Sequence, residues 1–164
     1  MESDSEKLFN SSFGLKLNQE QIVRELINFM KADERRRYKL LIGTDSEKNS
    51  GGTADFVTAI VIHRVGNGGR YFWRRIVNNR KFHTLRDRIL EEVLMSLDVA
   101  KELLLTTKHF AMPDFDFEIH VDVGENGATR SMIQELVGMV RAMNFEAKTK
   151  PESYAASKVA DRHV

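Results

Sequence analysis

The chain has 164 residues, of which 41% are hydrophobic and 30% charged, and its formal net charge is +1. This length fits a single domain, 1–164, with residues 1–17 as an N-terminal arm. Cysteine is absent, which excludes disulfides, thiolate nucleophiles and cysteine-bound zinc. No apolar run approaches the roughly 20 residues that span a bilayer, and the acidic start is unlike a targeting signal. We therefore expect a cytoplasmic protein without a membrane partner.

The first half of the chain changes from a helical to a strand pattern. Asn18 and Gln21 form a capping-box pair before apolar positions at helical spacing. The nearly continuous apolar run 38–43 is typical of a strand buried on both faces. The glycine-rich stretch 66–69 predicts a hairpin turn between two further strands. In order, the predicted elements are a helix to about Lys31 and strands over 38–45, 55–63 and 70–77.

In the second half, helices and strands alternate. The predicted elements are a helix over 84–105, a strand over 117–121 that ends at Asp122, a helix over 128–143, a short strand over 145–148 and a helix over 153–162. Three leading strands with tight turns, then alternating units, predict an α/β fold with a five-stranded mixed sheet. Its first three strands form an antiparallel meander, the later crossovers are parallel, and helices flank the sheet, including an extra N-terminal one. The strand at 117–122 should lie beside the first strand.

Two acids stand at strand ends. Asp45 follows the buried run 38–43, and Asp122 follows the strand 117–121. In open α/β sheets the carboxyl ends of the strands form the ligand crevice. An isolated aspartate at such a place is more often an Asx turn or a helix cap, so each residue alone is a weak signal.

Two more acids lie on predicted helices. Glu92 shares the inward face of its helix with Ile89 and Val93, where a carboxylate is costly unless it is paired, protonated or bound to metal. A salt bridge to an arginine is the alternative for Glu92, and Glu91 is the alternative ligand. Asp161 lies in the last turn of the C-terminal helix, where the helix dipole disfavours negative charge. A bound cation would compensate; the alternative is a fraying chain end.

Together, these four carboxylates favour hard cations with oxygen ligands, Mg²⁺ or Mn²⁺. Two such ions about 3.5–4 Å apart activate a water and stabilise the leaving oxygen of a phosphodiester. The sequence thus predicts a two-metal site with Asp45, Glu92, Asp122 and Asp161 as its catalytic and metal-binding residues.

The segment 70–88 is rich in arginine interleaved with aromatic residues. Basic groups neutralise phosphates and aromatic faces stack on bases, so this segment is a candidate nucleic-acid surface. The alternative is a solvated hairpin whose aromatic side chains pack the core. Together with two lysines near the C-terminus, the candidate nucleic-acid-binding residues are Arg70, Arg74, Arg75, Arg80, Lys81, Lys150 and Lys158.

Two histidines lie near the predicted acids. His120 is two residues before Asp122 and on the same strand face, where a satisfied sheet histidine is favoured over a phosphate or proton-transfer group. His163 is two residues past Asp161 and is a weaker candidate for reaching the substrate phosphate.

In order and placement, Asp45, Glu92, Asp122 and Asp161 resemble the acids of ribonuclease H-like proteins. More narrowly, the chain resembles the YkuK-type family of that superfamily. The stretches that carry the resemblance are 42–46, 56–64 with 68–73, 117–127 and 150–157 through 160–161. The resemblance implies the fold and a two-metal acidic site, but it supplies no substrate.

The leading functional hypothesis is a metal-dependent nuclease that hydrolyses phosphodiester bonds in RNA, RNA–DNA hybrid or structured DNA. Two alternatives remain open: a non-catalytic nucleic-acid-binding or regulatory module on the same fold, and a metal-dependent phosphatase for small molecules. The oligomeric state is left open.

Overall fold

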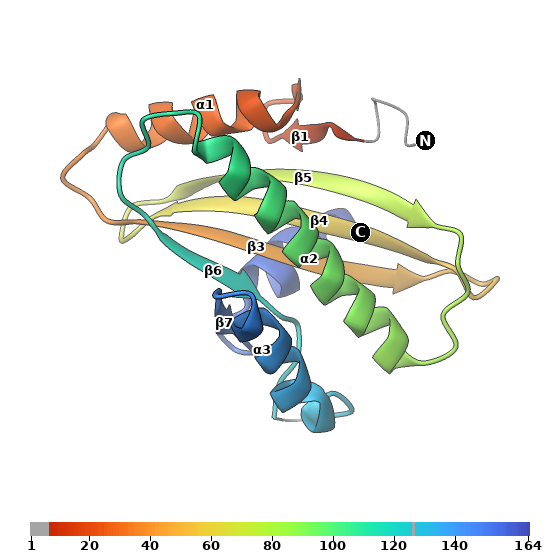
Figure 1. The fold of residues 1–164 in the computed structure, drawn as a ribbon. Coiled ribbons are helices and arrows are strands. Elements are labelled where there is room, and N and C mark those ends of the chain that lie inside the picture. Colours follow the sequence, from red (N-terminus) through yellow and green to blue (C-terminus); the bar gives the residue numbers. More distant parts are fainter. Residues whose placement is uncertain (1–6, 126) are drawn as a thin grey trace.

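One mixed sheet of seven strands, in the order β2-β1-β5-β4-β3-β6-β7, organises the protein (Figure 1). The computed structural model describes residues 7–125 and 127–164. β3, β4 and β5 form the predicted antiparallel meander, and β6 pairs with β3 in parallel, as predicted. β7 continues the parallel pairing beside β6. The strands are β1 Phe9–Ser11, β2 Lys16–Leu17, β3 Tyr38–Lys48, β4 Ala54–Arg64, β5 Gly69–Asn78, β6 Asp116–His120 and β7 Glu146–Lys148.

The prediction of five strands was wrong, because part of the N-terminal arm joins the sheet. β1 and β2 form a hairpin, and β1 pairs with the outer edge of β5. The Ser11 hydroxyl oxygen accepts the Leu15 N–H at 3.0 Å, and Gly14 has a positive φ of 81° in the turn. Strands of two and three residues are too short to show the alternation by which strands are predicted. Residues 1–6 of the arm lie outside the described residues.

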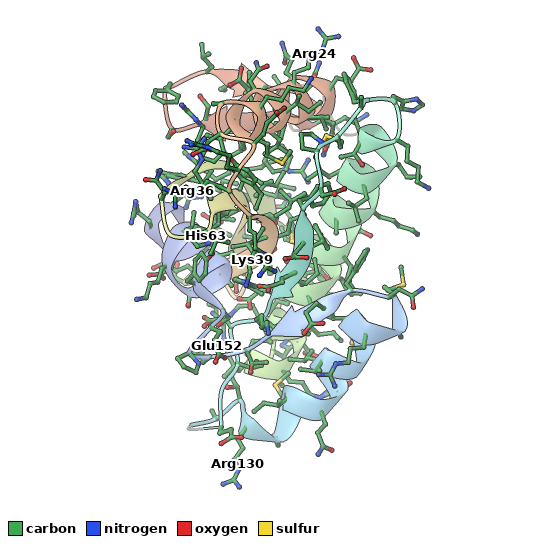
Figure 2. The ribbon with its side chains drawn as sticks, turned by 90° about the vertical axis from the view of Figure 1, so that its left-hand side faces the viewer. Arg24, Arg36, Lys39, His63, Arg130 and Glu152 are labelled. Carbon is green, nitrogen blue, oxygen red and sulfur yellow. The ribbon has the colours of Figure 1, made fainter. Side chains whose placement is uncertain are left out.

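Helices cover both faces of the sheet. α1, α2 and α3 pack on one face of the sheet and share one hydrophobic core with it, whereas η3 and η4 lie on the opposite face (Figure 1). Seen from the side, the C-terminal segment and α2 lie on opposite sides of the strands (Figure 2). The predicted C-terminal helix is instead a short π-helix followed by a 3-10 turn, and a 3-10 turn precedes α3. The elements are α1 Gln19–Lys31, α2 Leu85–Thr107, η2 Arg130–Met132, α3 Ile133–Ala142, η3 Ala155–Ala160 and η4 Asp161–His163.

The two covered faces explain the continuous apolar run at the start of β3. Leu40 and Ile42 point into the core shared with α1 and α2, whereas Leu41 packs against η3. All three side chains are almost fully buried, and burying each contributes roughly 1.5–3 kcal/mol. A side chain on β3 therefore faces α2 at even positions and η3 at odd positions, which decides where each site residue points.

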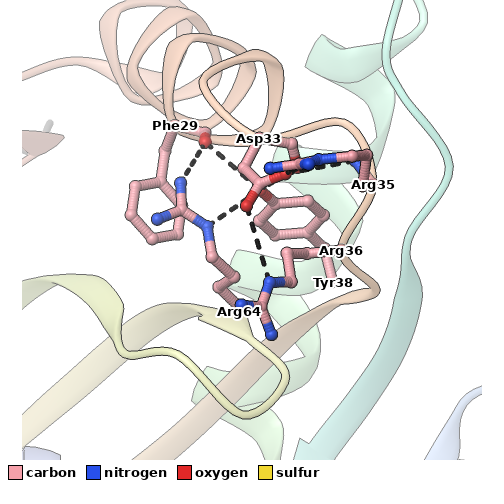
Figure 3. A network of polar contacts seen from close by, with 6 residues as sticks. All are labelled: Phe29, Asp33, Arg35, Arg36, Tyr38 and Arg64. Atoms are coloured by element: carbon pink, nitrogen blue, oxygen red, sulfur yellow. Dashed lines mark hydrogen bonds and ion pairs between the residues drawn. The ribbon is translucent and has the colours of Figure 1, made fainter.

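A network of polar contacts surrounds the amino end of β3 (Figure 3). The Tyr38 hydroxyl donates to the Asp33 carbonyl oxygen at 2.7 Å and accepts from Arg64 Nε at 2.9 Å. Arg64 also donates to the Phe29 carbonyl oxygen at 2.8 Å and stacks over the Phe29 ring. Asp33 holds two further side chains of the network, Arg35 and Arg36. The network joins α1 to β3 and β4 at the end of the sheet opposite Asp45.

The capping box predicted for α1 is confirmed, with Asn18 and Gln21 bonded reciprocally. Within the described residues, no helix is both long and apolar enough to cross a membrane.

Candidate functional site

Asp45 and Asp122 lie just past the end of the parallel pairing between β3 and β6. The prediction that the first strand ends at Asp45 was wrong, because β3 continues to Lys48 along β4 and Asp45 pairs with Val57. The last residue pair between β3 and β6 joins Gly43 to His120, and each aspartate lies two residues further along its chain. Because side chains alternate along a strand, both aspartates share the face of Gly43 and His120. That face is covered by η3, whose Ala155 N–H donates to His120 Nδ1 at 3.1 Å.

Asp161 reaches Asp45 from η4, directly after η3. A Cβ atom at Gly43 would lie 2.5 Å from the Ala156 nitrogen, so only glycine lets the backbone of η3 approach β3 this closely. The close approach brings the Asp161 side chain into a hydrogen bond with Asp45. Two carboxyl groups share a hydrogen bond only when one of them carries a proton.

Glu92 approaches the aspartates from the helical side. It is 6% exposed, and Ser46, the even-numbered neighbour of Asp45, donates from Oγ to Glu92 Oε1 at 2.6 Å. One turn further along α2, Ser96 Oγ lies 2.7 Å from Thr44 Oγ1 and fixes the helix on β3. Glu91 instead pairs with Arg80 at 3.6 Å. The structure therefore places Glu92, and not Glu91, next to β3.

Asp122 has a cation as its neighbour. Lys150 Nζ lies 3.2 Å from Asp122 Oδ1, without hydrogen-bond geometry. This buried oxygen has no hydrogen-bond partner among the described residues. A buried acceptor without a donor is costly, so a donor or a more strongly bound cation at this oxygen would stabilise Asp122.

Burial and mutual repulsion raise the pKa values of two of these acids. The pKa of Asp45 rises to about 7, chiefly because of burial, then through the hydrogen bond with Asp161 and the charges of Asp122 and Asp161. The pKa of Glu92 rises to about 8, again chiefly because of burial, with contributions from Asp45 and Asp122. The hydrogen bond from Ser46 opposes this rise. The acids thus interact beside the end of the parallel pairing between β3 and β6.

These shifts predict a pH-dependent stability in the absence of divalent metal. A carboxyl whose pKa is raised in the folded state stabilises the protein while it stays protonated, and this contribution is lost as the pH rises through the folded pKa. The Tm should therefore fall between about pH 5 and about pH 9, as Asp45 (about 7) and Glu92 (about 8) ionise. Glu92→Gln should raise the Tm at the alkaline end by about 2–8 °C, equivalent to roughly 1–2 kcal/mol.

The matched control is Glu91→Gln, which removes the same charge from the adjacent position outside this group. Thermal unfolding in EDTA across that pH range should give a flatter profile for Glu92→Gln and the wild-type slope for Glu91→Gln. Equal slopes in all three proteins would show that Glu92 does not carry the effect.

The donor set fits a divalent cation by its chemistry. All four groups are hard oxygen donors, two have raised pKa values and one has an unsatisfied buried oxygen. In the described arrangement, however, no three His, Asp or Glu side chains are disposed to hold one ion. Each acid is paired inside the chain instead: Asp45 with Asp161, Glu92 with Ser46, and Asp122 with Lys150.

The structure distributes the predicted basic residues over different surfaces. Arg74 lies on the helical side of β5 over the Phe9 ring, whereas Arg75 lies on the opposite face and pairs with Asp55. Arg75, Val57 and Asp45 occupy one row across β5, β4 and β3. The other candidates are Arg70, which stacks on Phe13 and Phe29, Arg80, which pairs with Glu91, Lys150, which pairs with Asp122, and Lys81 and Lys158, which are exposed.

The two histidines hold the C-terminal segment on the sheet. The Nδ1 of His120 accepts from Ala155, and its Nε2 lies 3.0 Å from Glu118 Oε2. Burial lowers the pKa of His120, and these contacts fit the neutral ring with its proton on Nε2. His163 stacks on Trp73 with ring centroids 4.2 Å apart. Both histidines therefore help to place Asp161.

Sequence reasoning missed Ser46 as the partner of Glu92 and Lys150 as the partner of Asp122. Extending the alternation of β3 by one residue past Asp45 would have assigned Ser46 to the helical face. The contact between Lys150 and Asp122 depends on the register of β7 against β6. The sequence predicts the strand and the parallel crossover but not this register.

An antiparallel meander, a parallel strand beside its first member, and acids just past the parallel pairing of these two strands define a ribonuclease H-like protein. A family model described as Ribonuclease H-like matches residues 21–164, and the chain belongs to this family. It is of the YkuK type, since it is 34% identical over 153 residues to the uncharacterized protein YkuK of Bacillus subtilis (strain 168). The match covers 87% of this chain and 88% of that protein. No solved structure matches the chain significantly.

Proposed function

We propose that this protein is a nuclease that uses Mg²⁺ or Mn²⁺ to hydrolyse phosphodiester bonds in RNA, RNA–DNA hybrid or structured DNA. The observation that carries the proposal is that Asp45, Glu92, Asp122 and Asp161 come from different parts of the chain to the region just past the parallel pairing of β3 and β6. Burial, together with the charges of neighbouring acids, raises the pKa values of Asp45 and Glu92. Family membership supports it. The acids that would hold metal are Asp45, Glu92, Asp122 and Asp161.

Bound divalent ions would supply an activated water and charge stabilisation for the leaving oxygen. The chain's own residues position the ligands. The chain of hydroxyl contacts from Ser96 through Thr44 to Thr58 fixes the helix that carries Glu92. The close contact of η3 with Gly43 sets the position of Asp161. A rigid sheet and docked helices are suitable supports for such a constellation, because the ligand directions are then set before substrate binds.

A gel assay with labelled single strands, duplexes, RNA–DNA hybrids and junctions, with and without Mn²⁺, tests the proposal. We expect Mn²⁺-dependent cleavage of at least one of these substrates. Cleavage of a chromogenic phosphate ester but of no oligonucleotide would instead support a small-molecule phosphatase. If the protein neither binds nor cleaves any of these nucleic acids at low salt, this result contradicts every role in nucleic-acid chemistry.

A second candidate is a nucleic-acid-binding module that does not cleave. It is favoured by one observation, the internal pairing of each acid described above. In the same assay, this module would shift the mobility of the nucleic acid and leave it intact in every metal.

Arg75 is the residue of the basic segment best placed to hold the substrate backbone. It shares a row and a sheet face with Asp45, and Asp55 holds its guanidinium while 47% of the side chain stays exposed. Arg75→Gln should weaken binding to all sequences alike and should flatten the slope of log K against log salt by about one unit. Fluorescence anisotropy at several salt concentrations measures both effects.

Arg86→Gln is the matched control for Arg75→Gln. Arg86 is similarly exposed at 52% and similarly paired, with Glu135, but it joins α2 to α3 on the helical side. In Arg86→Gln, the slope of log K against log salt should remain that of the wild type. An equal loss in both variants would mean that net charge, and not the position of Arg75, determines binding.

A further inference from the structure

The backbone holds Lys150 beside Asp122. Parallel pairing continues beyond β6 and β7, since the Val121 N–H donates to the Lys148 carbonyl oxygen at 2.8 Å. Two residues further on, the Lys150 N–H donates to the Val123 carbonyl oxygen at 2.7 Å. These two hydrogen bonds lie on either side of Asp122 in the sequence. The main chain at Lys150 is therefore fixed relative to the main chain at Asp122.

The side chain of Lys150 follows a path that a glycine leaves open. A Cβ atom at Gly124 would lie 3.0 Å from Lys150 Cβ and 3.4 Å from Lys150 Cδ. The lysine stem thus packs against the bare backbone of the loop after β6. The stem carries Nζ to 3.2 Å from Asp122 Oδ1, although the lysine side chain as a whole is 51% exposed.

The ammonium group of Lys150 is a compact positive charge that lies beside Asp122 Oδ1. This oxygen has no hydrogen-bond partner among the described residues. We infer that Lys150 is an internal counter-cation of the acidic site, which competes with divalent metal for Asp122. The inference rests on the proposed function, because it takes Asp122 as a metal ligand. Metal uptake must displace the ammonium group, which is then released beside the site where a substrate phosphate is expected.

This competition has a measurable cost in metal affinity. A positive charge at this distance both neutralises one ligand and repels a divalent ion. Lys150→Met, which keeps the length of the stem and removes the charge, should tighten Mn²⁺ binding about five- to thirtyfold. In an Asp122→Asn background the same substitution should bring no gain, because the carboxylate charge for which the two cations compete is gone.

Lys148→Met is the matched control. It causes the same change in net charge two residues away, but Lys148 Nζ pairs with Glu146 at 3.7 Å instead of with a site acid. Its effect on Mn²⁺ affinity should stay below about twofold at physiological salt, where distant charges are screened.

Calorimetric titration of the full chain with Mn²⁺ separates the outcomes. The inference is supported if Lys150→Met tightens Mn²⁺ binding more than Lys148→Met does. Equal affinities in the wild type and both variants, or weaker binding in Lys150→Met, overturn it and leave the metal site standing. Absence of Mn²⁺ binding from all three proteins overturns both the inference and the proposed metal-dependent function.

A measurement on the wild type requires no variant to fold. Amine acetylation followed by mass spectrometry reports how freely each lysine reacts. Mn²⁺ should accelerate acetylation of Lys150 several-fold and leave Lys148 unchanged. A rate at Lys150 that does not respond to saturating Mn²⁺ would show that the ammonium is not displaced, and would overturn the inference.

Discussion

Asp45→Asn should lower Mn²⁺-dependent cleavage by at least about a hundredfold and leave nucleic-acid binding intact or slightly tighter. Asparagine keeps the shape of the side chain but removes the charge beside Asp122 and the acid that pairs with Asp161. Loss of one negative charge also reduces the repulsion of a phosphate backbone. Cleavage is measured under single-turnover conditions, and binding is measured by anisotropy in Ca²⁺ or EDTA.

Asp98→Asn is the control for this substitution. Asp98 is exposed on α2, so the same chemical change occurs away from the acids. It should leave both cleavage and Mn²⁺ affinity unchanged. Calorimetry should show weaker Mn²⁺ binding in both Asp45→Asn and Asp122→Asn. Wild-type Mn²⁺ binding in both variants would contradict the proposed site.

The placement of Asp45 and Asp122 could be predicted in part because it depends on local pattern. A continuous apolar run predicts a strand covered on both faces, and both aspartates directly follow such a run. The position of Glu92 follows from helical spacing for the same reason. The continuation of β3 past Asp45 to Lys48 could not be predicted, since it depends on pairing with β4. The close contact of η3 with β3 could not be predicted, since it depends on the absence of a side chain at Gly43 and on packing between distant segments.

The basic segment shows a different limit. Arginines at adjacent positions of a strand point to opposite faces, so Arg74 and Arg75 never form one surface. Counting charge along the sequence overlooks this alternation. The pairing of Arg75 with Asp55 and of Arg80 with Glu91 also depends on tertiary neighbours that composition does not reveal. Of the segment 70–88, Arg75 shares a strand row with Asp45 and is therefore the residue to test first.

Gly43→Ala should destabilise the protein although it adds only one methyl group. The new Cβ would lie 2.5 Å from the Ala156 nitrogen and 2.8 Å from the Ala155 carbonyl carbon, both of them backbone atoms. Overpacking of this kind costs about 1–3 kcal/mol, and each kcal/mol lowers the Tm of a chain of this size by roughly 2–4 °C. Thermal unfolding measures the loss.

The control variant, Gly138→Ala, should change the stability in the opposite direction. Gly138 is exposed within α3, and a Cβ atom there meets nothing within 4 Å. Gly138→Ala should therefore stabilise the protein by about 0.5–1 kcal/mol through helix propensity.

The two variants also differ in their expected metal binding. To relieve its clash, Gly43→Ala must push η3 away from β3, and this movement carries Asp161 away from Asp45. Mn²⁺ affinity should fall in Gly43→Ala and stay at the wild-type value in Gly138→Ala. A destabilised Gly43→Ala that still binds Mn²⁺ normally would exclude Asp161 from the metal ligands and leave the site to Asp45, Glu92 and Asp122.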